Sequence, residues 1–240
     1  MASKAVEDYL KTIFTLSVAG DAASTSAIAE RLGIAAGSVT GMLKRLSAEG
    51  LIEHVPYYGA RLTAQGEREA VRLIRRHRVL ETFLVKVLGY TWDRVHEEAD
   101  RLEHAVTDEL IDRMAQVLGG ATADPHGAPI PSSDGEFVDE QYPSLEEMRV
   151  GARGVLRRVD DEDPEALRYL AELELVPGVE VQLLGRAPFN GPLKVQVGEH
   201  EHFVGADLAR TLQVESLEVR PGGAKRIRRL GEKGEAEDHG

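Results

Sequence analysis

Apolar residues recur at helical spacing through the first fifty positions of the chain. Between Ser3 and Val18 they share one face, formed by Val6, Leu10, Ile13 and Phe14. Ser24 and its neighbours form a cap before a short helical pattern at 27–32, which Gly33 ends. A third pattern at 37–49 stops at Gly50, a residue suited to the end of a helix. We therefore predict three helices in this region.

A hairpin is predicted to follow these helices. Residues 51–55 form a largely β-branched run, and Gly59 lies in the turn that leads to residues 61–63. Helix, turn, helix and hairpin is the order of a winged helix-turn-helix, whose second helix enters the major groove of DNA. Small polar side chains suit base edges, and cations suit phosphates. The predicted DNA contacts are Ser38, Thr40, Lys44, Arg45 and Arg61. The alternative is a helical packing module.

The periodicity changes once along the rest of the chain. Helical patterns cover residues 63–88, 92–104 and 108–118, and residues 119–143 are rich in Gly, Pro, Ser and Asp, as in a loop. A period of two then predicts short strands, with one helix among them, in a small β-barrel. The strands are expected at 155–159, 180–185, 193–197, 202–204 and 214–219, and the helix at 164–173.

These patterns predict a mainly α fold with a small β module. The expected parts are a winged helix-turn-helix domain at 1–72, a helical domain at 73–143, a β-barrel at 150–219 and a charged, Gly-rich tail at 220–240, which we expect to be disordered.

Composition narrows the chemistry of this fold. The 240-residue chain has no cysteine, which excludes disulfides and thiolate metal sites, so any metal ligands must be nitrogen or oxygen atoms. It carries a net charge of −12, but residues 1–80 hold 11 Lys/Arg against 8 Asp/Glu, a local charge of +3. This weakly basic N-terminal region can bind DNA although the whole chain is acidic, because contacts with phosphates are short-range. With no apolar run of membrane-spanning length and no signal peptide, a cytoplasmic protein with no membrane partner is expected.

Imidazole and carboxylate groups cluster in the predicted middle helices. If residues 96–104 are helical, Asp100, Glu103 and His104 stand at i, i+3 and i+4 on one face, within reach of one ion. His96 lies one turn before Asp100, and His77 and Glu81 have the same spacing on an earlier helix. Two helices that offer these groups together indicate a divalent-metal site.

Several segments together resemble the family of the diphtheria toxin repressor and the manganese transport regulator. The similar segments are Glu7–Phe14, Arg76–Glu81, Val95–His104 and Asp124–Pro131. The resemblance spans residues 3–219. It implies a homodimeric, metal-dependent repressor that binds a palindromic DNA operator and controls metal homeostasis. It also implies that the middle helices form a metal-binding and dimerisation domain and that the barrel is SH3-like, similar to ferrous-iron-transport accessory proteins.

The resemblance also implies ligand sets for two ions per subunit. One site would use Asp8, Asp100, Glu103 and His104, and its neighbour would use His77, Glu81 and His96; in manganese-type relatives His77 joins the first set. The chain departs from the family pattern at two places. Lys11 occupies a position where manganese-type relatives can carry a ligating glutamate. Gly37 and Gly41, in the helix expected to enter the major groove, replace residues that help contact DNA in relatives. The barrel can also lend ligands in three-domain relatives, with Glu162, Asp163 and Glu165 in the corresponding stretch.

Hard carboxylates at positions 8 and 100 favour Mn²⁺ and a manganese-responsive repressor of metal-transport genes, with an iron-responsive Fe²⁺ repressor as the alternative. A zinc hydrolase is disfavoured, because no H-E-x-x-H sequence occurs and a filled ligand set leaves no place for substrate. We therefore expect no enzyme. A third alternative is a metal-independent regulator whose barrel binds a partner protein or peptide. His126 is interpreted as bracing its loop, and His54, His200 and His202 as surface residues.

Overall fold

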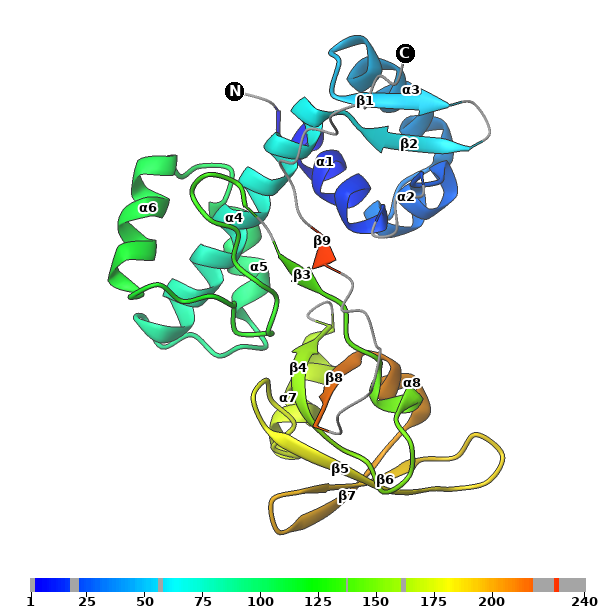
Figure 1. Ribbon diagram of the computed structural model, residues 1–240. Helices are drawn as coiled ribbons and strands as arrows, with labels where there is room; N and C mark the ends of the chain where they lie inside the picture. Colours follow the sequence, from blue (N-terminus) through cyan, green and yellow to red (C-terminus); the bar gives the residue numbers. More distant parts are fainter. Residues whose placement is uncertain are drawn as a thin grey trace, which may run out of the picture. The chain divides into compact units, whose positions relative to one another are not determined.

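The computed structural model describes residues 3–17, 22–55, 58–136, 138–160, 163–217 and 227–228. Two compact units are present. The first unit contains residues 1–77, 131–137 and 230–240, and the second contains residues 78–130 and 138–229. Helices dominate the N-terminal half and strands the C-terminal part, so the predicted mainly α fold with a small β module is confirmed (Figure 1).

The first unit is a winged helix-turn-helix. Its elements are α1 (Lys4–Leu16), α2 (Thr25–Leu32), α3 (Ala36–Ala48), β1 (Ile52–Val55), β2 (Gly59–Leu62) and the start of α4 (Ala64–Lys86). The Ser24 hydroxyl caps α2 by accepting the Ala27 N–H, and Gly33 ends the helix with a φ of 63°. The apolar faces of the helices meet in one core that includes Ile13, Ile28 and Leu43.

The wing is an antiparallel hairpin held against the helices. β1 and β2 pair in the register Ile52↔Leu62 to Val55↔Gly59. The next residue, Ala60, bridges to Ala23, which precedes α2. Gly59 has a φ of 109°, and a Cβ atom at this position would lie 2.1 Å from the Ala23 carbonyl oxygen. A residue without a side chain is therefore needed where the wing meets the helical core.

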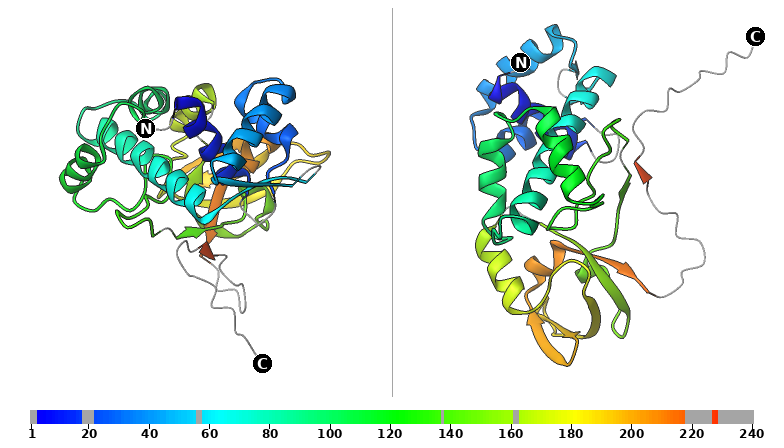
Figure 2. Two further views of the ribbon diagram at one scale, coloured as in Figure 1. Left: turned by 90° about the horizontal axis from the view of Figure 1, so that it is seen from above. Right: turned by 90° about the vertical axis from the view of Figure 1, so that its left-hand side faces the viewer.

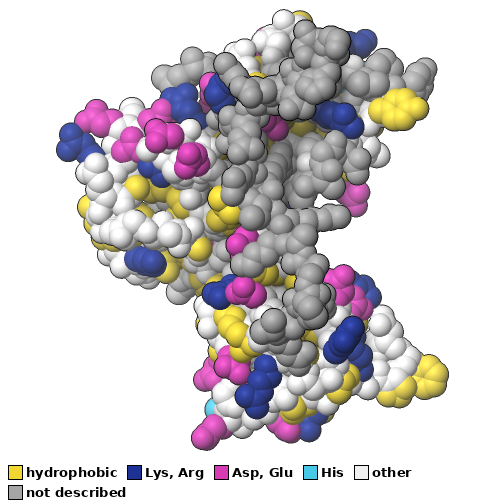
Figure 3. All heavy atoms as spheres, viewed as in Figure 1, with side chains coloured by type: hydrophobic (Ala, Val, Ile, Leu, Met, Phe, Trp, Pro, Cys, Tyr) yellow, Lys and Arg dark blue, Asp and Glu magenta, His cyan; other side chains and the backbone are white. Residues whose placement is uncertain are grey.

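The helical part of the second unit contains the rest of α4, together with α5 (Val95–Leu102) and α6 (Asp108–Val117). Val79, Leu80, Ala99 and Ile111 form its buried core. Acidic side chains gather over α6, whose first turn carries Asp108 and Glu109 (Figure 3). Negative charge at a helix N-terminus is favourable because it faces the positive end of the helix dipole.

The predicted helix at 92–104 is shorter than expected at both ends. It begins at Val95, because Trp92 packs against the core of the barrel and Asp93 pairs with Arg168 of the barrel. It ends at Leu102, and Glu103 is a cap residue that keeps helical dihedral angles and donates its N–H to the Ala99 carbonyl. The i, i+3 relation of Asp100 and Glu103 therefore remains, while His104 lies in the following turn.

The β module is a five-stranded antiparallel sheet in the order β7-β6-β5-β4-β8. Its strands run from yellow-green to orange in Figure 2. Its strands are β4 (Arg153–Val159), β5 (Glu180–Arg186), β6 (Leu193–Val197), β7 (His200–Val204) and β8 (Leu212–Ser216). The predicted α7 (Pro164–Glu172) is present, and its Leu167 and Leu170 are fully buried in the core of the module. A second helix that the sequence did not predict, α8 (Ala206–Arg210), precedes β8.

A 3₁₀ turn, η1 (Leu145–Glu147), and two short strands complete the second unit. β3 (Asp139–Glu140) pairs with β9 (Ile227–Arg228). Apart from residues 227–228, the chain beyond residue 217 lies outside the described residues, so the expected disorder of the 220–240 tail stays a prediction. Among the residues that the structure describes, no helix is both long and apolar enough to cross a membrane.

Candidate metal centre and DNA-binding face

Three buried side chains in the second unit bring together nitrogen and oxygen atoms that could bind one metal ion. Glu81 of α4 and Asp124 and His126 of the loop after α6 each offer one ligand atom, and these atoms lie within 4.8 Å of one another. Glu81 is completely buried and His126 is 1% exposed. Burying two carboxylates is costly unless cations compensate them. Arg78 compensates part of this negative charge, and an ion held by the three side chains would compensate the rest.

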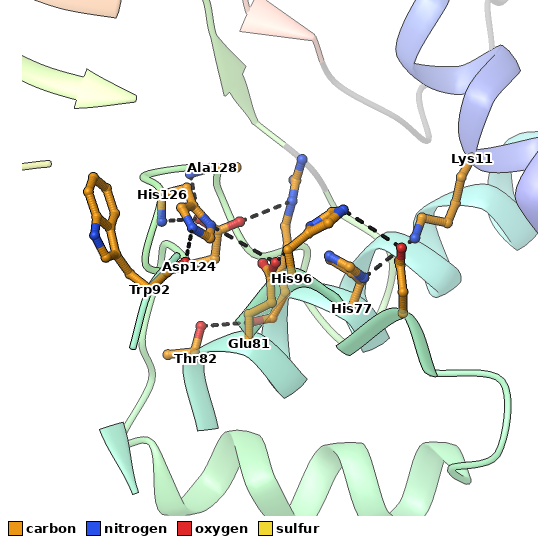
Figure 4. Close-up of polar contacts among 11 residues, drawn as sticks. Lys11, His77, Glu81, Thr82, Trp92, His96, Asp124, His126 and Ala128 are labelled. Atoms are coloured by element: carbon orange, nitrogen blue, oxygen red, sulfur yellow. Dashed lines mark hydrogen bonds and ion pairs between the residues drawn. The ribbon is translucent and has the colours of Figure 1, made fainter. Parts of the chain in front are cut away.

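His126 is oriented for this role by a backbone carbonyl. Its Nε2 atom lies 2.8 Å from the Trp92 carbonyl oxygen, and the two rings stack with their centroids 5.7 Å apart (Figure 4). Because a carbonyl can only accept, Nε2 carries the proton, and in the neutral ring Nδ1 keeps its lone pair. Nδ1 lies 3.9 Å from Glu81 Oε1. Two neighbouring ligand atoms at about 2.2 Å from one ion lie about 3.1–3.6 Å apart, so a small movement of these two atoms would let both bind one metal.

Asp124 and Arg78 fix the loop that carries His126. One oxygen of Asp124 accepts the backbone N–H groups of His126 and Ala128, each at 2.9 Å. Its other oxygen lies 3.6 Å from Arg78 Nε, while Arg78 Nη1 donates to the Pro129 carbonyl. The predicted bracing function of this loop belongs to Asp124 as much as to His126. The guanidinium also neutralises one carboxylate, which leaves a smaller negative charge near Glu81.

His96 lies between Glu81 and Asp100. Its Nδ1 is 3.1 Å from Glu81 Oε1 (Figure 4). Its Nε2 is 3.7 Å from Asp100 Oδ2. If Nδ1 donates to the buried carboxylate, Nε2 presents a lone pair beside the Asp100 carboxylate. The structure thus brings together Glu81, His96 and Asp100 from α4 and α5, and links them through Glu81 to His126.

Glu103 and His104 lie at the end of α5. Glu103 is completely buried, and its Oε1 atom is 3.6 Å from His104 Nε2. A fully buried carboxylate beside an imidazole, next to the half-exposed Asp100, suits a divalent cation with oxygen and nitrogen ligands. Five predicted ligands therefore lie in the second unit. Glu81, His96 and Asp100 are linked by contacts, and Glu103 and His104, which contact each other, follow directly after α5.

The remaining predicted ligands, Asp8 and His77, belong to the first unit. Asp8 is half-buried on α1, and His77 on α4 is 6% exposed. His77 lies one helical turn before Glu81 on the same helix. The participation of Asp8 and His77 in one site with residues of the second unit stays a prediction.

The loop that carries His126 is attached to the barrel. The Val159 N–H of β4 donates to the His126 carbonyl at 2.9 Å, and Gly127 lies against the backbone of Arg157. Arg168 of α7 also donates to Asp93 at 3.2 Å. Burial acts to raise the pKa of Asp93, but hydrogen bonds from Thr91 and Arg168 outweigh it and hold that pKa below its usual value. The barrel and the metal-ligand loop are therefore directly connected.

The structure refines the expectation that the barrel can lend metal ligands. Asp163 caps α7 by accepting the backbone N–H groups of Glu165 and Ala166, so one of its oxygens has a structural function; Glu162 lies outside the described residues.

Sequence reasoning did not select Asp124 and His126 as ligands. The available signal was the Asp-x-His spacing in a loop already singled out for its family resemblance.

The five predicted DNA contacts lie on the surface of the first unit. All five are exposed: Ser38, Thr40, Lys44 and Arg45 on α3, and Arg61 on β2. Two already have intramolecular partners, because the Thr40 hydroxyl donates to the Ala36 carbonyl and Arg45 pairs with Glu49 at 2.8 Å. Thr40 can thus contribute only its acceptor lone pairs to a base edge, and the exposed Arg45 pair is weak enough to be exchanged for a phosphate.

Comparison with known proteins identifies the family. Residues 1–60 match the N-terminal DNA-binding domain of iron-dependent repressors, and residues 63–132 match their metal-binding and dimerisation domain. Residues 144–216 match the FeoA domain. The iron-dependent repressor IdeR of Mycobacterium tuberculosis (strain ATCC 25618 / H37Rv) is 36% identical over 224 residues, which cover 88% of this chain and 96% of IdeR. The chain belongs to the iron-dependent repressor family.

Other members of the iron-dependent repressor family are similarly related. The diphtheria toxin repressor of Corynebacterium diphtheriae (strain ATCC 700971 / NCTC 13129 / Biotype gravis) is 28% identical over 221 residues, with 88% of this chain and 96% of that protein covered. A solved manganese-dependent transcriptional repressor in complex with manganese is 38% identical, with a TM-score of 0.81 over 88% of this chain and 100% of that chain. The manganese regulator SloR is 33% identical, with a TM-score of 0.72 over 88% of this chain and 98% of SloR.

Membership of the iron-dependent repressor family confirms the predicted class of function. The protein is a metal-dependent, DNA-binding transcriptional repressor with a dimerisation domain, and the family is not one of enzymes. The zinc-hydrolase alternative is therefore excluded. A metal-independent regulator is likewise disfavoured by the metal-binding domain.

Proposed function

We propose that this repressor responds to Mn²⁺ and controls metal-transport genes. The observation that carries this proposal is the donor set: the predicted ligands are carboxylates and imidazoles, and the chain has no cysteine. Hard oxygen ligands favour manganese over softer metals, although affinity alone follows the Irving–Williams order. Fe²⁺ is the alternative metal, since relatives named as iron-dependent are 36% identical to this chain.

Two ions per subunit are proposed. Asp8, Asp100, Glu103 and His104 would hold one ion, and His77, Glu81 and His96 would contribute to a second. The buried position of Asp124 and His126 beside Glu81 adds them as candidates for the second ion. Bound Mn²⁺ would supply positive charge to compensate the buried carboxylates. The residues themselves supply geometry, because Trp92 and Glu81 orient the rings of His126 and His96.

The proposed switch is a ligand set shared between the DNA-binding head and the helical domain. Asp8 lies on the first helix of the head, whereas Asp100, Glu103 and His104 lie at α5. An ion held by both groups would fix one orientation of the head, and without it the carboxylates repel one another. In a homodimer this would set the spacing of two α3 helices for a palindromic operator, with half-sites about one DNA turn apart. Ser38, Thr40, Lys44, Arg45 and Arg61 are the proposed DNA contacts.

The experiment that tests this function measures binding to DNA upstream of metal-transport genes in Mn²⁺, Fe²⁺, Zn²⁺ or chelator. Tight binding is expected with Mn²⁺ and is expected to disappear with chelator, because DNA and metal binding are coupled. Replacing both Ser38 and Lys44 with alanine should weaken DNA binding while Mn²⁺ affinity in the absence of DNA stays unchanged. Equal binding with Mn²⁺ and chelator would contradict the proposal, and activation by Fe²⁺ alone would favour the iron alternative.

A further inference from the structure

Lys11 contacts one of the predicted metal ligands. Its ammonium nitrogen on α1 lies 3.4 Å from Nδ1 of His77 on α4, within the first unit (Figure 4). His77 is 6% exposed, and Lys11 is half-buried. A cationic side chain therefore lies against a buried imidazole that is expected to bind a cation.

The chemistry of this contact conflicts with metal binding by His77. An ammonium group can only donate, so Nδ1 of His77 must accept with its lone pair. In the neutral ring the proton is then on Nε2, and neither nitrogen has a lone pair for an ion. His77 can become a ligand only after the hydrogen bond from Lys11 has been broken. The positive charge of Lys11 would also repel an approaching ion over a few ångströms.

We propose that Lys11 is an intramolecular competitor of the metal for His77. In the metal-free protein Lys11 holds the imidazole, and Mn²⁺ must displace the ammonium before His77 completes its ligand set. Lys11 thereby raises the metal concentration at which the repressor becomes active. This inference rests on the proposed function for the assignment of His77 as a ligand, but the contact itself can be tested without metal.

The first test is a double-mutant cycle on the full-length protein, with Mn²⁺ alone as the probe in equilibrium dialysis. Lys11→Met keeps most of the apolar stem and removes the charge, and it should tighten Mn²⁺ binding about tenfold, because one charged hydrogen bond no longer competes. Lys11→Arg should bind as the wild type does. In the His77→Gln background, Lys11→Met should have a much smaller effect, because the group for which it competes is absent and only charge repulsion remains.

Two results of this cycle would overturn the proposal. One is an unchanged Mn²⁺ affinity in Lys11→Met, and the other is an equal gain with and without His77, which would indicate general charge repulsion. Lys4→Met is the matched control, because Lys4 is an exposed lysine at the start of the same helix. It should leave Mn²⁺ affinity unchanged.

The second test uses ¹⁵N NMR of the histidine rings in the metal-free, full-length protein. His77 should have an unprotonated, hydrogen-bonded Nδ1 and a protonated Nε2, and the Nδ1 resonance should shift in Lys11→Met. Identical His77 resonances in the two proteins would overturn the proposal. Absence of Mn²⁺ binding in every variant would contradict the proposed function instead, and the NMR comparison would still decide whether Lys11 holds His77.

Discussion

Replacing Asp100 with asparagine is expected to weaken Mn²⁺-dependent DNA binding by about 100-fold, near the upper end of typical couplings between two binding sites. The amide keeps the shape of the side chain but removes the charge of a proposed ligand. Asp100 lies at the C-terminal end of α5 with its carboxylate 44% exposed, so the fold does not depend on burying it. The measurement is DNA affinity at fixed Mn²⁺, combined with the thermal unfolding temperature.

Glu97→Gln is the matched control for this substitution. Glu97 is on the same helix, but its side chain is 69% exposed and pairs with Arg101 at 3.6 Å. An exposed ion pair of this kind contributes about 0–1 kcal/mol. DNA binding by Glu97→Gln should therefore equal that of the wild type. A similar loss in both variants would show that the general charge of α5, rather than ligation by Asp100, controls DNA binding.

Gly127→Ala is expected to destabilise the second unit by about 3 kcal/mol. Gly127 has a φ of 90°, and a Cβ atom there would lie 1.8 Å from the Arg157 carbonyl oxygen. The loop would have to move away from β4, which would break the Val159–His126 backbone hydrogen bond. We expect a fall in unfolding temperature of about 6–12 °C. Mn²⁺ binding should also weaken, since the same loop positions Asp124 and His126.

Gly120→Ala separates backbone strain from steric overlap. Gly120 has a similar φ of 81°, but a Cβ atom there would meet nothing within 4 Å. Its substitution should cost about 1 kcal/mol through left-handed strain alone. If Gly120→Ala and Gly127→Ala lower the unfolding temperature equally, the close contact between the loop and the barrel does not hold in solution.

Local sequence patterns were sufficient for most elements of the fold. The three helices of the first unit and its hairpin follow from apolar spacing, the Ser24 cap and the glycines at 33 and 50. The pattern of apolar residues gave the wrong helix boundary where tertiary contacts determine the backbone conformation. Trp92 and Asp93 read as helical, but the barrel binds both side chains, and α5 begins at Val95. α8 is only five residues long, too short for a periodic signal.

Part of the candidate metal site could also be predicted from the spacing of residues in the sequence. Helical spacing relates His96 to Asp100 and His77 to Glu81, and the structure adds that Glu81 contacts His96. The position of His126 could not follow from spacing, because His126 and Glu81 are 45 positions apart in the sequence and only the fold brings them together. The contact of Lys11 with His77 likewise depends on how α1 packs against α4.

The most direct test of the central claim is a crystal structure of the full-length protein grown with excess Mn²⁺, with anomalous scattering recorded at the manganese edge. The account predicts a manganese peak ligated by Asp8 of the DNA-binding head together with Asp100, Glu103 and His104. Manganese bound only by residues of α4, α5 and the 124–126 loop, with Asp8 remote from every peak, would contradict the proposed link between metal binding and the orientation of the head.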